Sequence, residues 1–280
     1  KKIIDKCNKI AKSEGISQRQ TYIRTSKQLL RDTYNRTHPK RRKKARKADR
    51  KLKTIAGRLL RELTRTLSPL SLAAHQNQFN LYWQVLNQKR SDKNKIYSLH
   101  KPFTACIAKG KAHKQYEFGS KVGLVTTAKT LIITAIKSFG GNPHDSKTIE
   151  PLLDQMESNF KHTPKEVIYD RGGKGVKQIG HTKISTPDYK PLKRDTEYQR
   201  RSKRKKFRRR AAIEPVIGHL KTDFRMNQNY LWGANSPQIN AFLAATGWNL
   251  KKMMKQLKKE VVNFFESVLD LIFYPFSRME

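Results

Sequence analysis

The 280-residue chain is short of cysteine, of acidic residues and of long apolar runs. Its 2 cysteines, Cys7 and Cys106, are too few for a disulfide framework or a four-cysteine zinc site, and they indicate a reducing compartment. No stretch reaches the roughly 18 to 20 apolar residues of a membrane span, and no apolar segment follows the cationic N-terminus as in a signal peptide. The sequence therefore predicts neither a disulfide-stapled secreted protein nor a membrane protein.

Basic residues are abundant instead. Lys and Arg number 61 against 22 Asp and Glu, which gives a formal net charge of +39. This excess argues against an ordinary metabolic enzyme and for a polyanionic partner, because clustered cations displace counterions from a phosphate backbone. The 12 Phe, 10 Tyr and 3 Trp suffice for a packed core, so the chain is predicted to fold.

Two runs carry much of the positive charge. Residues 40–53 hold ten Lys or Arg and a single acid, and residues 200–210 hold nine Lys or Arg and no acid. A solvated helix face is the ordinary explanation of one such run, but two runs in so basic a chain favour phosphate binding, which positions a protein on double-stranded DNA without reading its sequence. The predicted DNA-binding cations are Lys40, Arg41, Arg42, Lys43, Lys44, Arg204, Lys205 and Lys206.

The chain is predicted to begin with a basic, all-helical segment over 1–95. Apolar residues recur there at helical spacing, interrupted by Gly15 and by Ser68-Pro69, which end helices. The expected helices cover 3–11, 17–36, 52–67 and 70–86. They are expected to form a small antiparallel bundle.

An α/β segment is predicted to follow over 96–232, with a C-terminal helix over 233–280. Its expected strands lie at 116–125, 130–137, 165–169 and 182–185, and its expected helices at 149–156 and 197–225. This order predicts a mixed sheet flanked by helices. Trp232 and Trp248 are expected in the core.

Asp170 is the first candidate for chemistry. It follows a short β-rich run and precedes the Gly-rich turn 171–175. Strand ends of open α/β sheets hold side chains toward a crevice where ligands and metals bind. A surface Asp that starts a turn is the alternative, and the local sequence alone favours it.

A helical stripe is the second candidate. At 100° per residue, Phe207, Arg210, Glu214 and Lys221 fall within about 60° of one another, so a carboxylate lies between two cations. Pro215 is expected to kink the helix or to start a new first turn. Read locally, Arg210 and Glu214 make an ordinary i,i+4 ion pair.

The spacing Phe207-x2-Arg210-x3-Glu214-x6-Lys221 resembles the Y-(2)-R-(3)-E-(6)-K signature of IS5-type bacterial insertion-sequence DDE transposases. The longer run 208–226 is similar to that family as well. So are the segments 107–122, 141–145 and 229–232, and the resemblance extends from near Lys1 to about Leu257.

The resemblance implies an RNase H-like fold in which three carboxylates hold two Mg²⁺ ions, with Mn²⁺ as an acceptable substitute. Asp170 matches the second Asp and Glu214 the Glu of this catalytic and metal-binding triad. The implied activity is cleavage at the element's ends and strand transfer by in-line phosphoryl displacement. Arg210 and Lys221 are implied to grip phosphates, and Phe207 to stack on a base. A homo-oligomeric active complex in the bacterial cytoplasm, at the nucleoid, is implied too.

The sequence departs from the family pattern in three places. Phe207 replaces the Tyr, and Gly173 stands where relatives carry an aromatic residue, which is expected to loosen the turn after Asp170. In the family, the strand bearing the first Asp is the expected centre of the sheet and precedes the basic helical segment, so its place is expected before Lys1. We therefore interpret the chain as the C-terminal part of a transposase, inactive alone and poorly soluble because two strand edges are open.

Two alternatives stay open. A basic nucleic-acid-binding protein without catalysis explains the charge, but it does not explain a pair of carboxylates among so many cations. An inhibitory transposase remnant, which joins full-length copies in inactive complexes, is the other.

Overall fold

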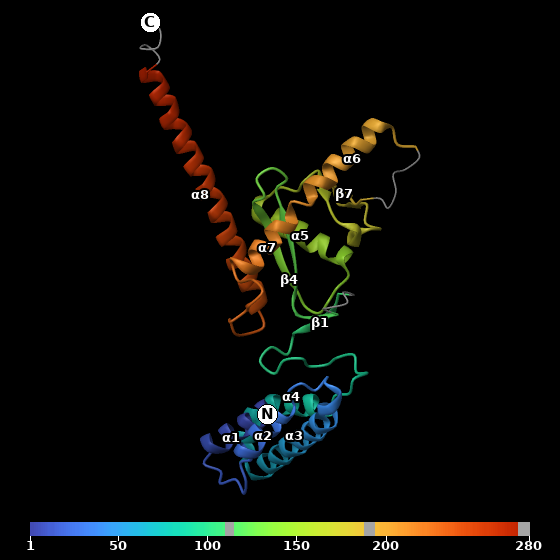
Figure 1. Ribbon diagram of the computed structural model, residues 1–280, viewed down its shortest axis with the longest axis vertical. Helices are drawn as coiled ribbons and strands as arrows, with labels where there is room; N and C mark the ends of the chain where they lie inside the picture. Colours follow the sequence, from blue (N-terminus) through green and yellow to red (C-terminus); the bar gives the residue numbers. More distant parts are fainter. Residues whose placement is uncertain (110–114, 188–193, 274–280) are drawn as a thin grey trace. The chain divides into compact units, whose positions relative to one another are not determined.

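The computed structural model describes residues 1–109, 115–187 and 194–273, with side chains to residue 269. The chain divides into two compact units, Lys1–Pro102 and Phe103–Glu280. Helices make up the first unit, while the second combines helices with three small sheets (Figure 1). The protein is thus a mixed α/β protein. No helix of the described part is long and apolar enough to cross a membrane.

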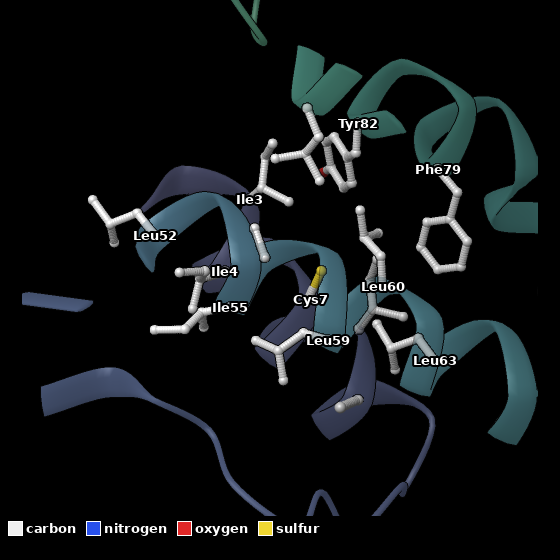
Figure 2. Packing of buried hydrophobic residues seen from close by; sticks show 14 of the residues in the cluster. Ile3, Ile4, Cys7, Leu52, Ile55, Leu59, Leu60, Leu63, Phe79 and Tyr82 are labelled. Atoms are coloured by element: carbon white, nitrogen blue, oxygen red, sulfur yellow. The ribbon is translucent and has the colours of Figure 1, made fainter. Parts of the chain in front are cut away.

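Four helices build the first unit. They are α1 (Lys2–Ser13), α2 (Ile23–Asp32), α3 (Pro39–Thr66) and α4 (Pro69–Asn87). Ser68 is the N-cap of α4, because its hydroxyl accepts the backbone N–H of Ser71 at 3.2 Å. Pro69 follows as the first helical residue, where its lack of a backbone N–H leaves no donor without a partner. Figure 2 shows the core, in which Leu59 and Leu60 of α3 meet Cys7 of α1.

The basic run 40–53 lies within α3. Its helix buries Ala45 and Ala48 and leaves the cations around them exposed. Small residues on the inner face let α3 pack closely although its outer face is crowded with charge. Lys44 forms an exposed ion pair with Asp32 of α2 at 2.9 Å, which partly offsets the repulsion.

The second unit begins with two antiparallel hairpins. The strands are β1 (Ala105–Ala108), β2 (Tyr116–Gly119), β3 (Lys121–Thr126) and β4 (Ile133–Phe139), paired as β1–β2 and β3–β4. A third sheet has the order β5–β7–β6, with β5 (Glu166–Ile168) parallel to β7 (Thr182–Ser185) and β6 (Gln178–Ile179) antiparallel to β7.

Helix α5 (Ile149–Phe160) joins two of these sheets through one core. Its residues Leu152, Leu153 and Met156 pack with Ala135 of β4 and Ile184 of β7. Among the described residues, however, β3 hydrogen-bonds only to β4, and β5 only to β7. In the described part of the chain, β3 and β5 therefore each have one edge without a strand partner, while their two sheets share a hydrophobic core.

The long C-terminal helix α8 (Ser236–Phe273) covers the outer edge of β4. Asn249 accepts the N–H of Ile133 and donates to its carbonyl, both at 2.8 Å. Gln238 likewise accepts the N–H of Ser138 at 2.7 Å and donates to the carbonyl of Ile136 at 3.0 Å. Eleven helical residues rise about 16 Å, the length of five strand residues, so the two amides reach both ends of β4.

The structure refines several expectations. The helix expected at 17–36 covers only Ile23–Asp32, and the strand expected at 116–125 is interrupted between Gly119 and Lys121, where one hairpin ends and the next begins. Trp248 is buried, as predicted, but the prediction for Trp232 is wrong, because 81% of that residue is exposed.

Candidate active site

Asp170 lies directly after β5, where the sheet gives way to a tight turn. Its Oδ1 accepts the backbone N–H of Gly172 at 2.9 Å, and it caps the short 3₁₀ turn Arg171–Gly173. The backbone of Tyr169 still pairs with Ser185 of β7 at 2.9 Å. The strand end and the cap together fix the direction of the Asp170 side chain.

Two glycines let this turn lie against its neighbours. A side chain at Gly172 would meet the carboxylate of Asp145, and one at Gly173 would come within 2.5 Å of the Tyr169 ring. The expectation that Gly173 loosens the turn is therefore wrong: the residue is buried, and the ring of Tyr169 fills the space. Burial also raises the pKa of Tyr169, whose hydroxyl lies 3.0 Å from that of Thr148.

Two segments that carry the family resemblance, 107–122 and 141–145, meet beside this turn. Lys121 of β3 donates to the carbonyl of Pro143 at 2.6 Å and forms an ion pair with Asp145. Asp145 in turn lies against Gly172. Residues far apart in the sequence thus support the turn that carries Asp170.

The expected helix 197–225 is divided into α6 (Glu197–Arg210) and α7 (Ile213–Thr222). Pro215 explains the division, because its ring would clash with the carbonyl of Ala211 in a continuous helix. Of the two outcomes expected for Pro215, a kink or a new first turn, the structure shows the second: Pro215 is the third residue of α7 and lies in its first turn. Thr196 and Gln199 form a capping box at the start of α6.

Arg210, the last residue of α6, bridges the two candidate carboxylates. One guanidinium nitrogen lies 3.1 Å from Oδ2 of Asp170, and another lies 3.2 Å from Oε1 of Glu214. Glu214 lies within reach of Arg210 although the two residues belong to different helices. The structure thus brings both predicted carboxylates to one cation, which is more than the local i,i+4 pair alone.

An open hollow of about 350 Å³ lies beside this bridge. Its lining consists of Asp170, Arg171, Gly172, Pro187, Phe207 and Arg210. Phe207 is half-buried and presents its ring to the hollow, next to the acidic group of Asp170. Lys221 does not line it: the residue is exposed on α7, about 10 Å along the helix from Glu214.

The cations of α6 divide into two groups. Lys206 pairs with Glu166 of β5 at 2.7 Å, and Arg209 donates to the carbonyls of Ala128 and Lys129, the latter at 2.7 Å. These two side chains anchor the helix to both sheets. Arg204 and Lys205 are exposed, and no ion pair or hydrogen bond of either is found within the described part of the chain.

Glu166 and Arg209 were not among the residues predicted to matter. Their contacts join positions 40 to 81 residues apart, so no local spacing marks them. Arg209 belongs to the basic run 200–210, but nothing in the sequence indicates that its side chain fixes α6 to the loop after β3.

No group of three or more His, Cys, Asp or Glu able to hold a metal ion exists among residues 1–109, 115–187 and 194–273. Asp170 and Glu214 nevertheless suit a hard cation, since two carboxylates already converge on one positive charge. In this structure that charge belongs to Arg210.

Comparison with known families decides the class of the protein. Residues 88–250, more than half of the chain, match the family model described as the transposase DDE domain. The chain belongs to this family. Membership in a transposase DDE domain family makes DNA transposition its functional class, DNA its binding partner and DNA cleavage the activity of its relatives. No curated protein and no solved structure matches the chain.

Proposed function

We propose that this transposase chain carries two of the three catalytic carboxylates of an IS5-type enzyme that cuts the ends of an insertion element and joins them to target DNA. The bridge of Asp170 and Glu214 by Arg210 is the observation that supports this most strongly. The three residues come from separate parts of the chain, and two of them, Asp170 and Arg210, line the open hollow. The cytoplasm, at the nucleoid, is the compartment that fits this role.

Asp170 and Glu214 would hold Mg²⁺, or Mn²⁺ in its place, with a third carboxylate. When bound, two such ions supply charge stabilisation at both the attacking and the leaving oxygen. The chain's own contribution is to hold both carboxylates close together. When they bind the metal in place of Arg210, the Arg210 guanidinium becomes available to a DNA phosphate.

The open edges of β3 and β5 fit an RNase H-like sheet that lacks its central strand. Both sheets pack on α5, and among the described residues neither inner edge is hydrogen-bonded. A strand inserted between them would complete a mixed sheet and end near Asp170. We propose that this strand carries the third carboxylate and belongs to the complete enzyme, of which this chain is the C-terminal part.

The DNA would be held by three kinds of contact. Arg210 and Lys221 bind phosphates next to the scissile bond, and the ring of Phe207 stacks on a base in the hollow. The exposed cations of α6 and α3 bind the backbone further away without reading sequence. Phe207 keeps the ring needed for stacking but cannot donate a hydroxyl proton.

Glu214→Gln tests the assignment. The chain should be fused behind a strand segment bearing an Asp, taken from a full-length family member, and assayed for Mg²⁺-dependent nicking of DNA. We expect Glu214→Gln to lower nicking by at least about 10³-fold, since a neutral amide binds Mg²⁺ poorly.

Glu260→Gln, on the exposed distal part of α8, is the matched control and should nick normally. Equal nicking by the Glu214→Gln protein would show that the assignment of this residue is wrong. DNA affinity, measured without Mg²⁺, should remain similar in both variants, so loss of binding cannot be mistaken for loss of catalysis.

The absence of a three-acid group within the described residues favours a second function, DNA binding without cleavage. In that case Asp170→Asn should leave the DNA affinity of the protein unchanged. An inhibitory remnant additionally requires association with an intact transposase, which co-purification of the two chains would detect.

A further inference from the structure

Helix α8 consists of two parts with different surroundings. Up to Asn249 it packs on β4 and α7, with Trp248 buried and its indole N–H bonded to the carbonyl of Leu131 at 2.8 Å. Lys251 still contacts residues outside α8, namely the carboxylate of Asp223 at 3.7 Å and the ring of Phe224. Beyond this residue the helix leads away from the sheets of its unit (Figure 1).

The outer part of α8 carries an apolar seam with a regular repeat. Its members alternate at spacings of four and three residues, and they are Leu250, Met254, Leu257, Val261, Phe264 and Val268. The first five are between 46% and 65% exposed, so no described part of the chain covers them. Alternating steps of four and three place apolar residues at the two core positions of a supercoiled helix pair, and over a segment this short a straight helix with a period of 3.6 presents the same stripe.

The residue types in the seam indicate the kind of partner. Leu250, Leu257 and Phe264 occupy one alternate position of the repeat, while Met254 and Val261 occupy the other. Leucine in the first and β-branched residues in the second favour two parallel strands. A seam of this kind is complementary to itself, because each helix offers the same knobs and the same holes.

The flanking charges allow parallel pairing of identical helices. Lys251 and Lys258 border the seam on one side, and in a parallel pair they lie beside Thr246 and Met253 of the other helix. No like charges then face each other, and the Lys stems cover apolar surface. Lys255 and Lys259 project from the opposite face into solvent.

The available area is close to that of a small interface. At roughly 100 Å² for each half-exposed side chain, the positions that face a parallel partner offer about 700 Å² per copy, against the roughly 800 Å² that each partner buries in a typical stable interface. The contributing residues are Leu250, Met253, Met254, Leu257, Val261, Phe264 and Phe265.

We propose that residues 250–268 bind the same segment of a second copy as a parallel two-stranded coiled coil. The interface includes none of the residues assigned to catalysis or to DNA. It therefore holds for the chain whether or not the proposed transposition chemistry is correct, and its test needs neither DNA nor metal.

The experiment measures the mass of the nuclease-treated full chain by light scattering in about 1 M salt, where charge-mediated clustering is screened. We expect twice the 32.6 kDa of one chain. In a Cys106→Ser background, Leu257→Cys should form a disulfide-linked dimer under mild oxidation, because parallel pairing places this position opposite itself. Lys255→Cys, two residues away on the solvent face, should not.

A double substitution completes the test. Leu257→Lys with Phe264→Lys should give a monomer with an unchanged melting temperature of the globular part, while Lys255→Ala with Lys259→Ala should remain a dimer. A monomeric parent chain overturns the proposal. In that case, alkylation of Leu257→Cys tests for another partner: protection in the isolated chain would indicate its own first unit, and protection that requires anionic vesicles would indicate a membrane surface. Equal cross-linking at positions 255 and 257 overturns it as well.

Discussion

Glu166 joins a strand to a helix through a single carboxylate. It accepts from Lys206 of α6 at 2.7 Å and from the hydroxyl of Ser185 at 2.6 Å. The hydrogen bond from Lys206, followed by that from Ser185, lowers the pKa of Glu166 below its ordinary value of 4.5. A carboxyl group with a lowered folded-state pKa stabilises the fold above the unfolded value, and the stabilisation is lost as the pH falls through the folded one.

Glu166→Gln should therefore destabilise the protein at neutral pH but not in acid. We expect the melting temperature of the variant to lie below that of the parent at pH 7, and the difference to close as the pH falls below 4.5. Circular dichroism melts at pH 7, 5 and 3 provide the measurement. A Glu157→Gln control, on the exposed face of α5, should show no such pH-dependent gap.

Residues of the candidate site differed in how far the sequence revealed them. Asp170 and Glu214 could be proposed from the sequence because they match the family signature, whereas their local sequence alone favoured a surface Asp and an ordinary ion pair. The sequence did not indicate that one guanidinium contacts both carboxylates, since the Arg210–Asp170 contact spans 40 residues and depends on how α6 meets β5. The same holds for Arg209, whose acceptors lie 80 residues away.

At the scale of elements, α8 protects an edge strand with side chains instead of another strand. Its two amides satisfy backbone groups of Ile133, Ile136 and Ser138 that would otherwise invite pairing with another chain. Helix propensity predicts α8 itself, but it carries no sign that Gln238 and Asn249 serve β4.

Asn249→Ala should cost about 1–3 kcal/mol of unfolding free energy, because the N–H and carbonyl of Ile133 lose their partners at a half-buried position. Urea denaturation followed by circular dichroism measures this. Gln256→Ala removes an amide from the exposed part of the same helix and should cost less than about 0.5 kcal/mol. Similar losses in both variants would contradict the role of Asn249.

Element types were predicted better than element limits. Gly15 and Pro69 act through their own backbone and mark helix ends in the sequence, as does Pro215 for the start of α7. The hairpin β1–β2 and the short β6 were not predicted, because their pairing depends on partners that local propensity does not specify.

For the whole molecule, the net charge of +39 predicts DNA affinity that falls steeply with salt. The structure separates cations already engaged within the fold, such as Lys206 and Arg209, from exposed ones on the same helix. Net charge alone cannot make this distinction. The sequence thus predicted the partner, whereas the fold indicates which side chains are available to it.

Arg204→Gln with Lys205→Gln should reduce the slope of log Kobs against log salt by about 1.8, since each lost phosphate contact removes about 0.9. Fluorescence anisotropy on a DNA duplex between about 50 and 300 mM salt gives the slope. Lys252→Gln, which removes one exposed-helix charge stacked on the Trp248 ring, serves as a comparison and should leave the slope nearly unchanged. An unaltered slope in the double variant would show that Arg204 and Lys205 do not contact the DNA phosphates.

The hydrogen bonds from Gln238 and Asn249 to β4 also affect how the chain folds during its synthesis. Ile133 and Asn249 lie 116 residues apart in the sequence, so this long-range contact forms only after residue 249 has left the ribosome. Until then the outer edge of β4 stays open on the nascent chain, during the period when unpaired strands are most prone to misassembly. Chaperone demand during synthesis is thus greatest between translation of β4 and translation of the first half of α8.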